Sequence, residues 1–166
     1  SKQGADRNSL LINLGGGVVT DLGGFVACTY KRGIDFINIP TSLLAMVDAS
    51  VGGKTGVDFQ GLKNQIGIIK EPEFVVIDDA FLQTLPHDEC RSGYAEMLKH
   101  GLIADADYFS ALSSKSIDIN DKMIDHIRHS VRIKSQVVTE DPFEQGLRKI
   151  LNYGHTLGHA IETHFL

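Results

Sequence analysis

The chain has 166 residues, of which 42% are hydrophobic and 22% charged, and its formal net charge is −5 at pH 7. This content suffices for one ordinary domain or two small ones, and the acidic balance argues against a general nucleic-acid-binding protein, which would carry a basic excess. No apolar run is long enough to span a membrane, and Cys28 and Cys90 form no C-x-x-C pair. We therefore expect a cytoplasmic protein in a reducing compartment, with neither nucleic-acid nor membrane partners.

The N-terminal half alternates between expected strands and expected helices. Strands are expected at Leu10–Leu14, which has the composition of a buried strand, at Ile34–Ile39 and at Phe74–Ile77. Helices are expected over Val18–Ala27 and Leu43–Val47. This alternation predicts a parallel sheet with helices on its faces.

Three glycines, Gly15, Gly16 and Gly17, separate the first expected strand from the first expected helix. A strand, a glycine turn and a helix form the context in which a pyrophosphate binds at a helix N-terminus. The strict G-x-G-x-x-G fingerprint is not met, because Thr20 occupies its last glycine position. Two interpretations stay open: a dinucleotide site, or a tight turn that allows close helix packing.

The segment Asp48–Gly56 (DASVGGKTG) combines an acid, two hydroxyls, a lysine and three glycines. We expect a loop, because glycine is unfavourable in helices and strands. Backbone N–H groups and the Lys54 ammonium in such a loop suit an anion. It is not a P-loop, because that motif requires a glycine five positions before Gly53, where Asp48 stands. A second polar loop is expected at Gly61–Gln65.

After Pro86 no strand is expected. Helices are expected over His87–Ala104, Tyr108–Leu112, Asn120–Val138 and from near Leu147 onward. Asp105 is expected to cap the second of these. The pattern predicts an α/β part over residues 1–85 followed by an all-α part over residues 86–166. The chain also ends inside an apolar helical pattern, so we expect it to be an internal piece of a longer protein.

Two pairs of polar residues have helical spacing. Glu96 and Lys99 lie three residues apart among apolar neighbours, so they form either a solvated ion pair or part of a site. His155 and His159 lie four residues apart, a spacing that can serve a divalent metal, although the Glu of the H-E-x-x-H motif is absent. The alternative is a helix face of histidines that are satisfied by hydrogen bonds.

Arg148 and Asn152 precede these histidines, so that positions 148, 152, 155 and 159 follow a 4-3-4 rhythm. This rhythm normally marks the buried stripe of a helix. A polar stripe at core spacing is unfavourable unless it lines a site. We therefore predict a functional face here.

Five long motifs run through the chain from Leu10 onward. They are Gly15–Asp21 (GGGVVTD), Pro40–Ala45 (PTSLLA), Val47–Gly56 (VDASVGGKTG), Gly93–Lys99 (GYAEMLK) and Gly146–Glu162 (GLRKILNYGHTLGHAIE). In order and spacing they resemble 3-dehydroquinate synthase, a sugar-phosphate cyclase, over nearly the whole chain.

The resemblance implies part of a parallel-sheet NAD-binding domain followed by part of a helical metal-binding domain, with the active site between them. It implies a phosphorus–oxygen lyase of the shikimate pathway, which leads to chorismate and aromatic amino acids. The enzyme converts the seven-carbon sugar acid phosphate DAHP into 3-dehydroquinate and phosphate. The steps are NAD-dependent oxidation, phosphate elimination, reduction and aldol cyclisation. A divalent metal, zinc or cobalt, and a homodimer are also implied.

The resemblance implies roles for individual residues. For NAD they are Gly15, Gly16, Gly17, Asp21, Thr41, Ser42, Asp48, Lys54 and Lys63. For the metal they are Glu96 and His155, and a third ligand would lie past Leu166. For the substrate and catalysis they are Lys54, Asn64, Lys99, Lys134, Glu144, Arg148, Asn152, His159 and Arg32, the last lent across the dimer interface. We expect this chain alone to bind metal weakly and to be inactive.

Three other functions remain in competition. Other sugar-phosphate cyclases, such as 2-deoxy-scyllo-inosose or valiolone-type synthases, share these motifs, but Lys134, Arg148 and Asn152 favour a substrate with a carboxylate. An alcohol dehydrogenase of the glycerol dehydrogenase type would not need the Lys54 loop. A non-catalytic dimerisation or binding fragment is the third alternative.

Overall fold

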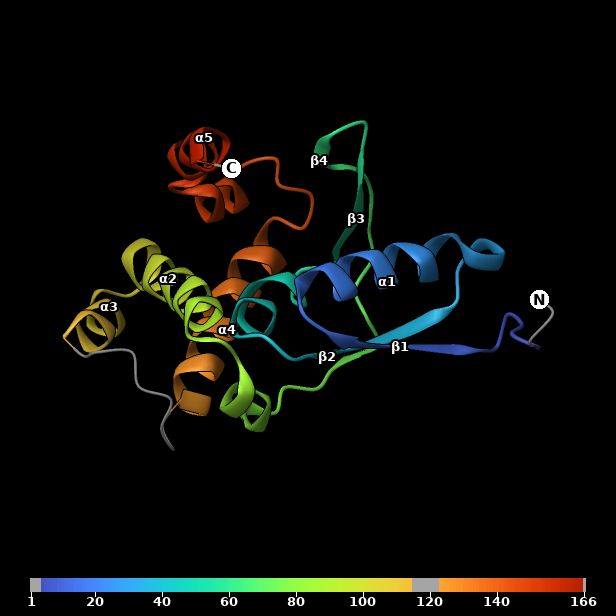
Figure 1. Ribbon diagram of the computed structural model, residues 1–166, viewed down its shortest axis with the longest axis horizontal. Coiled ribbons are helices and arrows are strands. Elements are labelled where there is room, and N and C mark those ends of the chain that lie inside the picture. Colours follow the sequence, from blue (N-terminus) through green and yellow to red (C-terminus); the bar gives the residue numbers. More distant parts are fainter. Residues whose placement is uncertain (1–3, 115–122, 166) are drawn as a thin grey trace.

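Figure 1 shows a computed structural model of the chain, which describes residues 4–114 and 123–165 except for the side chains at 159, 160, 162, 163 and 165. Strands and helices alternate in the first half, and only helices follow residue 86 in the described part. This order confirms the predicted change from an α/β part to an all-helical part of the chain. The division into two domains at residues 85 and 86 stays a prediction.

The first half contains a parallel three-stranded sheet. Its strand order is β1 (Leu10–Gly15), β2 (Asp35–Pro40) and β5 (Phe74–Val75). Ile37 pairs with Ile12 on one side and with Phe74 on the other. Helix α1 (Gly17–Thr29) and the short turn η1 (Tyr30–Arg32) connect the first two strands, and a small core of Ala27, Ile34 and Phe36 joins helix to sheet. The predicted parallel sheet is confirmed.

Strand β1 is not buried, contrary to its apolar composition. Leu10, Ile12 and Leu14 are 52%, 54% and 56% exposed, whereas Asn13 is buried. Successive side chains of a strand point to opposite faces. Asn13 lies beside Gly23 of α1 and donates to Asn38 Oδ1 at 2.9 Å, so the three apolar side chains occupy the other face. No element within the described ranges covers that face of β1.

An antiparallel hairpin takes up most of the second predicted loop and residues 54–56 of the first, whose residues 50–53 do form a turn. Strands β3 (Lys54–Phe59) and β4 (Leu62–Ile69) pair around a turn at Gln60 and Gly61, whose φ values are 52° and 79°. Positive φ at both positions is what a type I′ hairpin turn requires. Gly56 pairs with Gly67 across the ladder, so these glycines permit close backbone approach instead of ending the strands.

The helical half holds the main core. It is formed by the helices α2 (His87–Ala104), α3 (Ala106–Ser113) and α4 (Met123–Glu140). Two earlier segments contribute to the same core: the π-helical turn η2 (Ala45–Ala49) and the turn η3 (Asp79–Thr84). Helix α2 has its predicted bounds, and Asp105 caps α3 by accepting from Tyr108 N at 2.9 Å. The predicted start of α4 at Asn120 lies outside the described residues.

One buried apolar cluster fastens η2 to these helices. It includes Met46 and Val47 of η2, Met97 of α2, Leu112 of α3 and Ile127 of α4. Gly93 lets α2 come this close, because a Cβ at that position would lie 2.5 Å from Leu44 N. The segment that delivers Asp48 is therefore embedded in the core.

The last predicted helix is two helices. The 3₁₀ turn η4 (Leu147–Asn152) is followed by α5 (His155–Phe165), and Gly154 between them has φ 84°. That left-handed conformation cannot continue a right-handed helix. The prediction of one continuous polar stripe from position 148 to position 159 is therefore wrong. Within the described ranges, no helix is both long enough and apolar enough to cross a membrane.

Candidate functional site

A cavity of about 570 Å³ lies between the β3–β4 hairpin, η2, the helices α2 and α4, and η4. Most of the predicted site residues line it: Asp21, Asp48, Lys54, Asn64, Lys99, Lys134, Glu144, Arg148, Asn152 and His155. Segments far apart in the sequence therefore converge on one space. Arg148, Asn152 and His155 reach it even though they do not share one helix.

Glu144 and Lys54 line the side of the cavity that is more exposed to solvent, which we call the open side. The Glu144 carboxylate accepts from Lys54 Nζ at 2.6 Å and from Asn152 Nδ2 at 2.8 Å. Burial works to raise the pKa of Glu144, but these two hydrogen bonds hold it below its ordinary value. The Lys54 side chain is 51% exposed, so its ammonium remains open to solvent.

Asp48 and Lys134 form an ion pair on the opposite, buried side. Lys134 Nζ contacts the Asp48 carboxylate and also donates to the Asp48 carbonyl at 2.6 Å. Burial would raise the pKa of Asp48, but the Lys134 charge holds it below its ordinary value. Burial and the Asp48 charge raise the pKa of nearby Asp21 to about 6, because together they outweigh the opposing Lys134 charge.

Arg148 is 2% exposed and connects the turn at Gly52 and Gly53 to the segment after α4. It donates to Gly52 O and to Pro142 O, both at 2.7 Å. Gly52 has φ 98°, and a Cβ there would lie 2.9 Å from an Arg148 nitrogen. Two of the guanidinium donors therefore hold the backbone, and the others remain for a ligand.

Asp141, which the sequence analysis missed, organises the segment that carries Glu144. Its carboxylate accepts from the backbone N–H groups of Gln145, Gly146 and Arg148 at 2.9, 2.7 and 3.0 Å. The hydrogen bonds from Gly146 and Gln145 lower the pKa of Asp141. The Asp-Pro pair directly after a helix was the available signal, because Asp commonly accepts from backbone N–H groups in turns.

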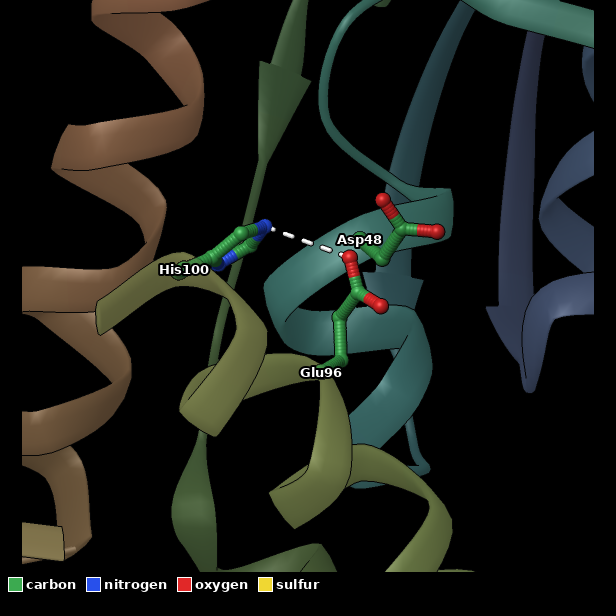
Figure 2. Close-up of side chains that lie close together, drawn as sticks. All are labelled: Asp48, Glu96 and His100. Atoms are coloured by element: carbon green, nitrogen blue, oxygen red, sulfur yellow. Dashed lines mark ion pairs between the residues drawn. The ribbon is translucent and has the colours of Figure 1, made fainter. Parts of the chain in front are cut away.

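Asp48, Glu96 and His100 could hold a metal ion, because one ligand atom from each lies within 4.8 Å of the others. Figure 2 shows their polar ends pointing toward one another, with Asp48 on η2 and the other two on α2. Glu96 Oε1 lies 2.5 Å from Lys99 Nζ and 3.2 Å from His100 Nε2. Neither Oε1 nor Nε2 finds a well-aligned hydrogen-bond partner among the described residues, although both are buried. Buried carboxylate oxygens and an imidazole nitrogen are ligand types that suit a divalent cation.

The predicted metal ligands Glu96 and His155 are not in one such cluster. Both line a second cavity of about 520 Å³, together with Lys99. Burial works to raise the pKa of Glu96, but hydrogen bonding from His100 and the Lys99 charge hold it below its ordinary value. The side chain of His159 lies outside the described residues. His100 was not predicted, although it follows Glu96 by one helical turn.

The other predicted NAD residues gather beside the first cavity without lining it. Thr41 N donates to Gly15 O at 2.9 Å, and a Cβ on Gly16 would lie 3.4 Å from Ser42 Oγ. The glycine turn, including Gly17, and the Thr41–Ser42 pair thus meet at the carboxyl ends of β1 and β2. Ligands of open parallel sheets bind at such an edge.

Two predicted residues lie apart from this space. Lys63 on β4 and Arg32 on η1 are both exposed, and neither lines the cavity.

Two family models match the chain. The model described as 3-dehydroquinate synthase N-terminal matches residues 1–92, and the one described as 3-dehydroquinate synthase C-terminal matches residues 93–166. The 3-dehydroquinate synthase of Parabacteroides distasonis is 54% identical over 98% of this chain and 47% of its own length. That of a Picosynechococcus species is 52% identical over 99% of this chain and 47% of its own length. The chain thus spans about half the length of these relatives.

Solved structures agree. A 2-deoxy-scyllo-inosose synthase complexed with carbaglucose-6-phosphate, NAD⁺ and Co²⁺ is 30% identical, with a TM-score of 0.86 over 98% of this chain and 45% of its own. The 2-epi-5-epi-valiolone synthase of Streptomyces hygroscopicus, with NAD⁺ and Zn²⁺ bound, is 31% identical, with a TM-score of 0.84 over 97% of this chain and 47% of its own. From residue 1 to residue 166, this chain belongs to the 3-dehydroquinate synthase family.

Proposed function

We propose that this chain carries catalytic groups of a 3-dehydroquinate synthase, which converts DAHP into 3-dehydroquinate and phosphate. The observation that carries the proposal is the convergence of Lys54, Lys99, Lys134 and Arg148 on one cavity in a chain of net charge −5. Cations concentrated in this way suit a substrate with a phosphate and a carboxylate. Membership of the family supplies the reaction.

We assign the substrate phosphate to the open side of the cavity. The Lys54 ammonium is exposed and is paired only with a carboxylate there, so a phosphate dianion can take the place of Glu144. Arg148 is fixed by two backbone carbonyls and offers its remaining donors. Lys134 and Asn152 are the groups we assign to the carboxylate and hydroxyls of the substrate.

The cofactors proposed here are NAD and a divalent metal, zinc or cobalt. We assign Glu96 and His155 as metal ligands, and the support is that both line the second cavity. NAD⁺ would accept the hydride of the alcohol that the metal polarises. We place the NAD at the Gly15–Gly17 turn, which meets Thr41 and Ser42 at the carboxyl ends of β1 and β2.

A chimera tests the proposed function. The segment of the Parabacteroides distasonis synthase that aligns with this chain is replaced by this chain, to which it is 54% identical. We expect phosphate release from DAHP with NAD⁺ and zinc, loss of release with a chelator, and no net NADH. The isolated chain is expected to be inactive.

Three results would contradict the proposal. A folded chimera that releases no phosphate and accumulates NADH from simple polyols would assign the chain to the dehydrogenases. Phosphate release from glucose 6-phosphate instead of DAHP would favour the 2-deoxy-scyllo-inosose synthases. Turnover of DAHP by the isolated chain would contradict its expected inactivity.

We also propose that the protein is cytoplasmic and acts as a homodimer in which Arg32 is lent to the partner's site. The support is that Arg32 is exposed and does not line the cavity of its own chain. Sedimentation of the chimera tests the dimer. Mixing the Arg32→Ala chimera with the Lys54→Met chimera should raise activity above that of either variant alone if the site is shared. No increase would contradict sharing.

A further inference from the structure

His100 is a fully buried histidine that neither the sequence motifs nor the proposed reaction uses. Its Nδ1 lies 2.6 Å from Ser130 Oγ of α4, and its Nε2 lies 3.2 Å from Glu96 Oε1, one turn earlier on α2. Figure 2 shows the imidazole directed at the Glu96 carboxylate. We propose that His100 is a positioning residue, fixed by Ser130, that orients Glu96 toward a divalent cation. The cation part of this proposal rests on the proposed function.

The proposal specifies which nitrogen of His100 carries the hydrogen. A neutral imidazole has one donor and one acceptor, and a carboxylate only accepts. Nε2 must therefore carry the hydrogen that faces Glu96, and Nδ1 must accept from the Ser130 hydroxyl. The proposal thus requires the Nε2–H tautomer.

The surroundings hold this arrangement in place. Ser130, like His100, is 0% exposed. Helix α2 packs closely on α3, since a Cβ on Gly101 would lie 2.8 Å from Phe109 backbone atoms. Tyr108 of α3 donates to His126 O of α4 at 2.8 Å, which connects the third helix. The imidazole has little freedom to turn away from Glu96.

The polar contacts of His100 separate this role from that of an ordinary core histidine. A histidine that only fills the core would have both nitrogens satisfied or would be surrounded by apolar groups. Nε2 of His100 instead faces two carboxylates: it lies 3.2 Å from Glu96 Oε1 and within 4.8 Å of an Asp48 oxygen. Removal of a group that hydrogen-bonds to a metal ligand and orients it commonly lowers metal affinity by about 10–100-fold.

The first measurement is the ¹⁵N NMR spectrum of the His100 ring in the metal-free chain. The proposal predicts the Nε2–H tautomer in the wild-type chain and loss of this preference in Ser130→Ala. A dominant Nδ1–H tautomer would overturn the proposal. Since this measurement needs no metal, it decides the role of His100 independently of the proposed reaction.

The second measurement is the Co²⁺ affinity of the chimeric synthase described above, followed by visible absorption. We expect His100→Phe to weaken binding about 10–100-fold, and His100→Gln to retain more affinity, because its amide can still donate to Glu96. The matched control is His129→Gln, a histidine of α4 that pairs instead with Asp105 at 2.9 Å. Thermal unfolding shows that each variant is folded.

Two outcomes separate the claims. Unchanged Co²⁺ affinity in folded His100→Phe would overturn the positioning role. Absence of Co²⁺ binding by the unsubstituted chimera, which includes a segment past Leu166, would contradict the metal site of the proposed function. The tautomer would still decide whether His100 holds Glu96.

Discussion

The two sides of the cavity are built differently. The buried side presents Asp48, Lys99 and Lys134 from elements that the main apolar core holds together. The open side presents Lys54 and Glu144 from a hairpin and from a turn that Asp141 organises. Charges on the buried side are paired where solvent is scarce, so they fix positions. The ion pair on the open side is partly solvated, so an incoming anion can replace one partner.

The largest difference should appear in stability when one apolar side chain is shortened on each side. Met97 is 0% exposed in the core that supports the buried side, whereas Phe143 beside Glu144 is 69% exposed. We expect Met97→Ala to lower the free energy of unfolding by about 2–5 kcal/mol and Phe143→Ala to change it by about 0.5 kcal/mol or less. Urea unfolding measures both. Equal losses would contradict the assignment of one rigid and one open side.

A smaller difference is expected between the two lysines. Lys134→Met leaves Asp48 without its partner, and we expect a loss of about 2 kcal/mol, less than for a fully buried pair because Asp48 is 36% exposed. Lys54→Met should cost at most about 1 kcal/mol, because its ion pair is half solvated. Unfolding at two salt concentrations checks both values. A Lys54→Met loss that matched the Lys134→Met loss would show that the open side is as rigid as the buried one.

The smallest effect concerns Asp21, whose pKa is raised to about 6 from an ordinary value of 3.8. The folded chain therefore binds a proton here more tightly than the unfolded chain, so this group makes the fold less stable as pH rises from about 4 to above 6. Asp21→Asn should stabilise the fold at pH 8 by about 1 kcal/mol, after a discount for partial exposure, and not at pH 4. Urea midpoints at both pH values test this. An equal effect at the two pH values would show that the pKa is ordinary.

Local signals in the sequence predicted much of the fold. Apolar spacing gave α2 its bounds, and Asp105 caps α3 as expected, because both depend on residues within one or two turns. The predictions that failed concern features that depend on contacts between distant residues or on the backbone conformation of a single glycine. Gly56 suggests a loop until it is seen to pair with Gly67 across a ladder, and Gly154 breaks a pattern that looked continuous.

The candidate site divides in the same way. Motif resemblance found the residues that now line one cavity, including Lys54 and Arg148. It did not find Asp141 or His100, because these act on other residues of the site. The role of Asp141 depends on its hydrogen bonds from three backbone N–H groups, and the role of His100 depends on its contact with Ser130 in another helix. Neither contact is visible from spacing along the chain.

The central claim is that the open side of the cavity exchanges the Glu144 carboxylate for a substrate anion. The most direct test is kcat/KM for DAHP in the chimeric synthase with Lys54→Met, and Lys149→Met serves as the control because Lys149 is exposed and does not line the cavity. We predict a fall of about 10–100-fold for Lys54→Met, as expected for the loss of a hydrogen bond to a charged group, and no change for the control. An unchanged kcat/KM in the folded Lys54→Met chimera would contradict the account.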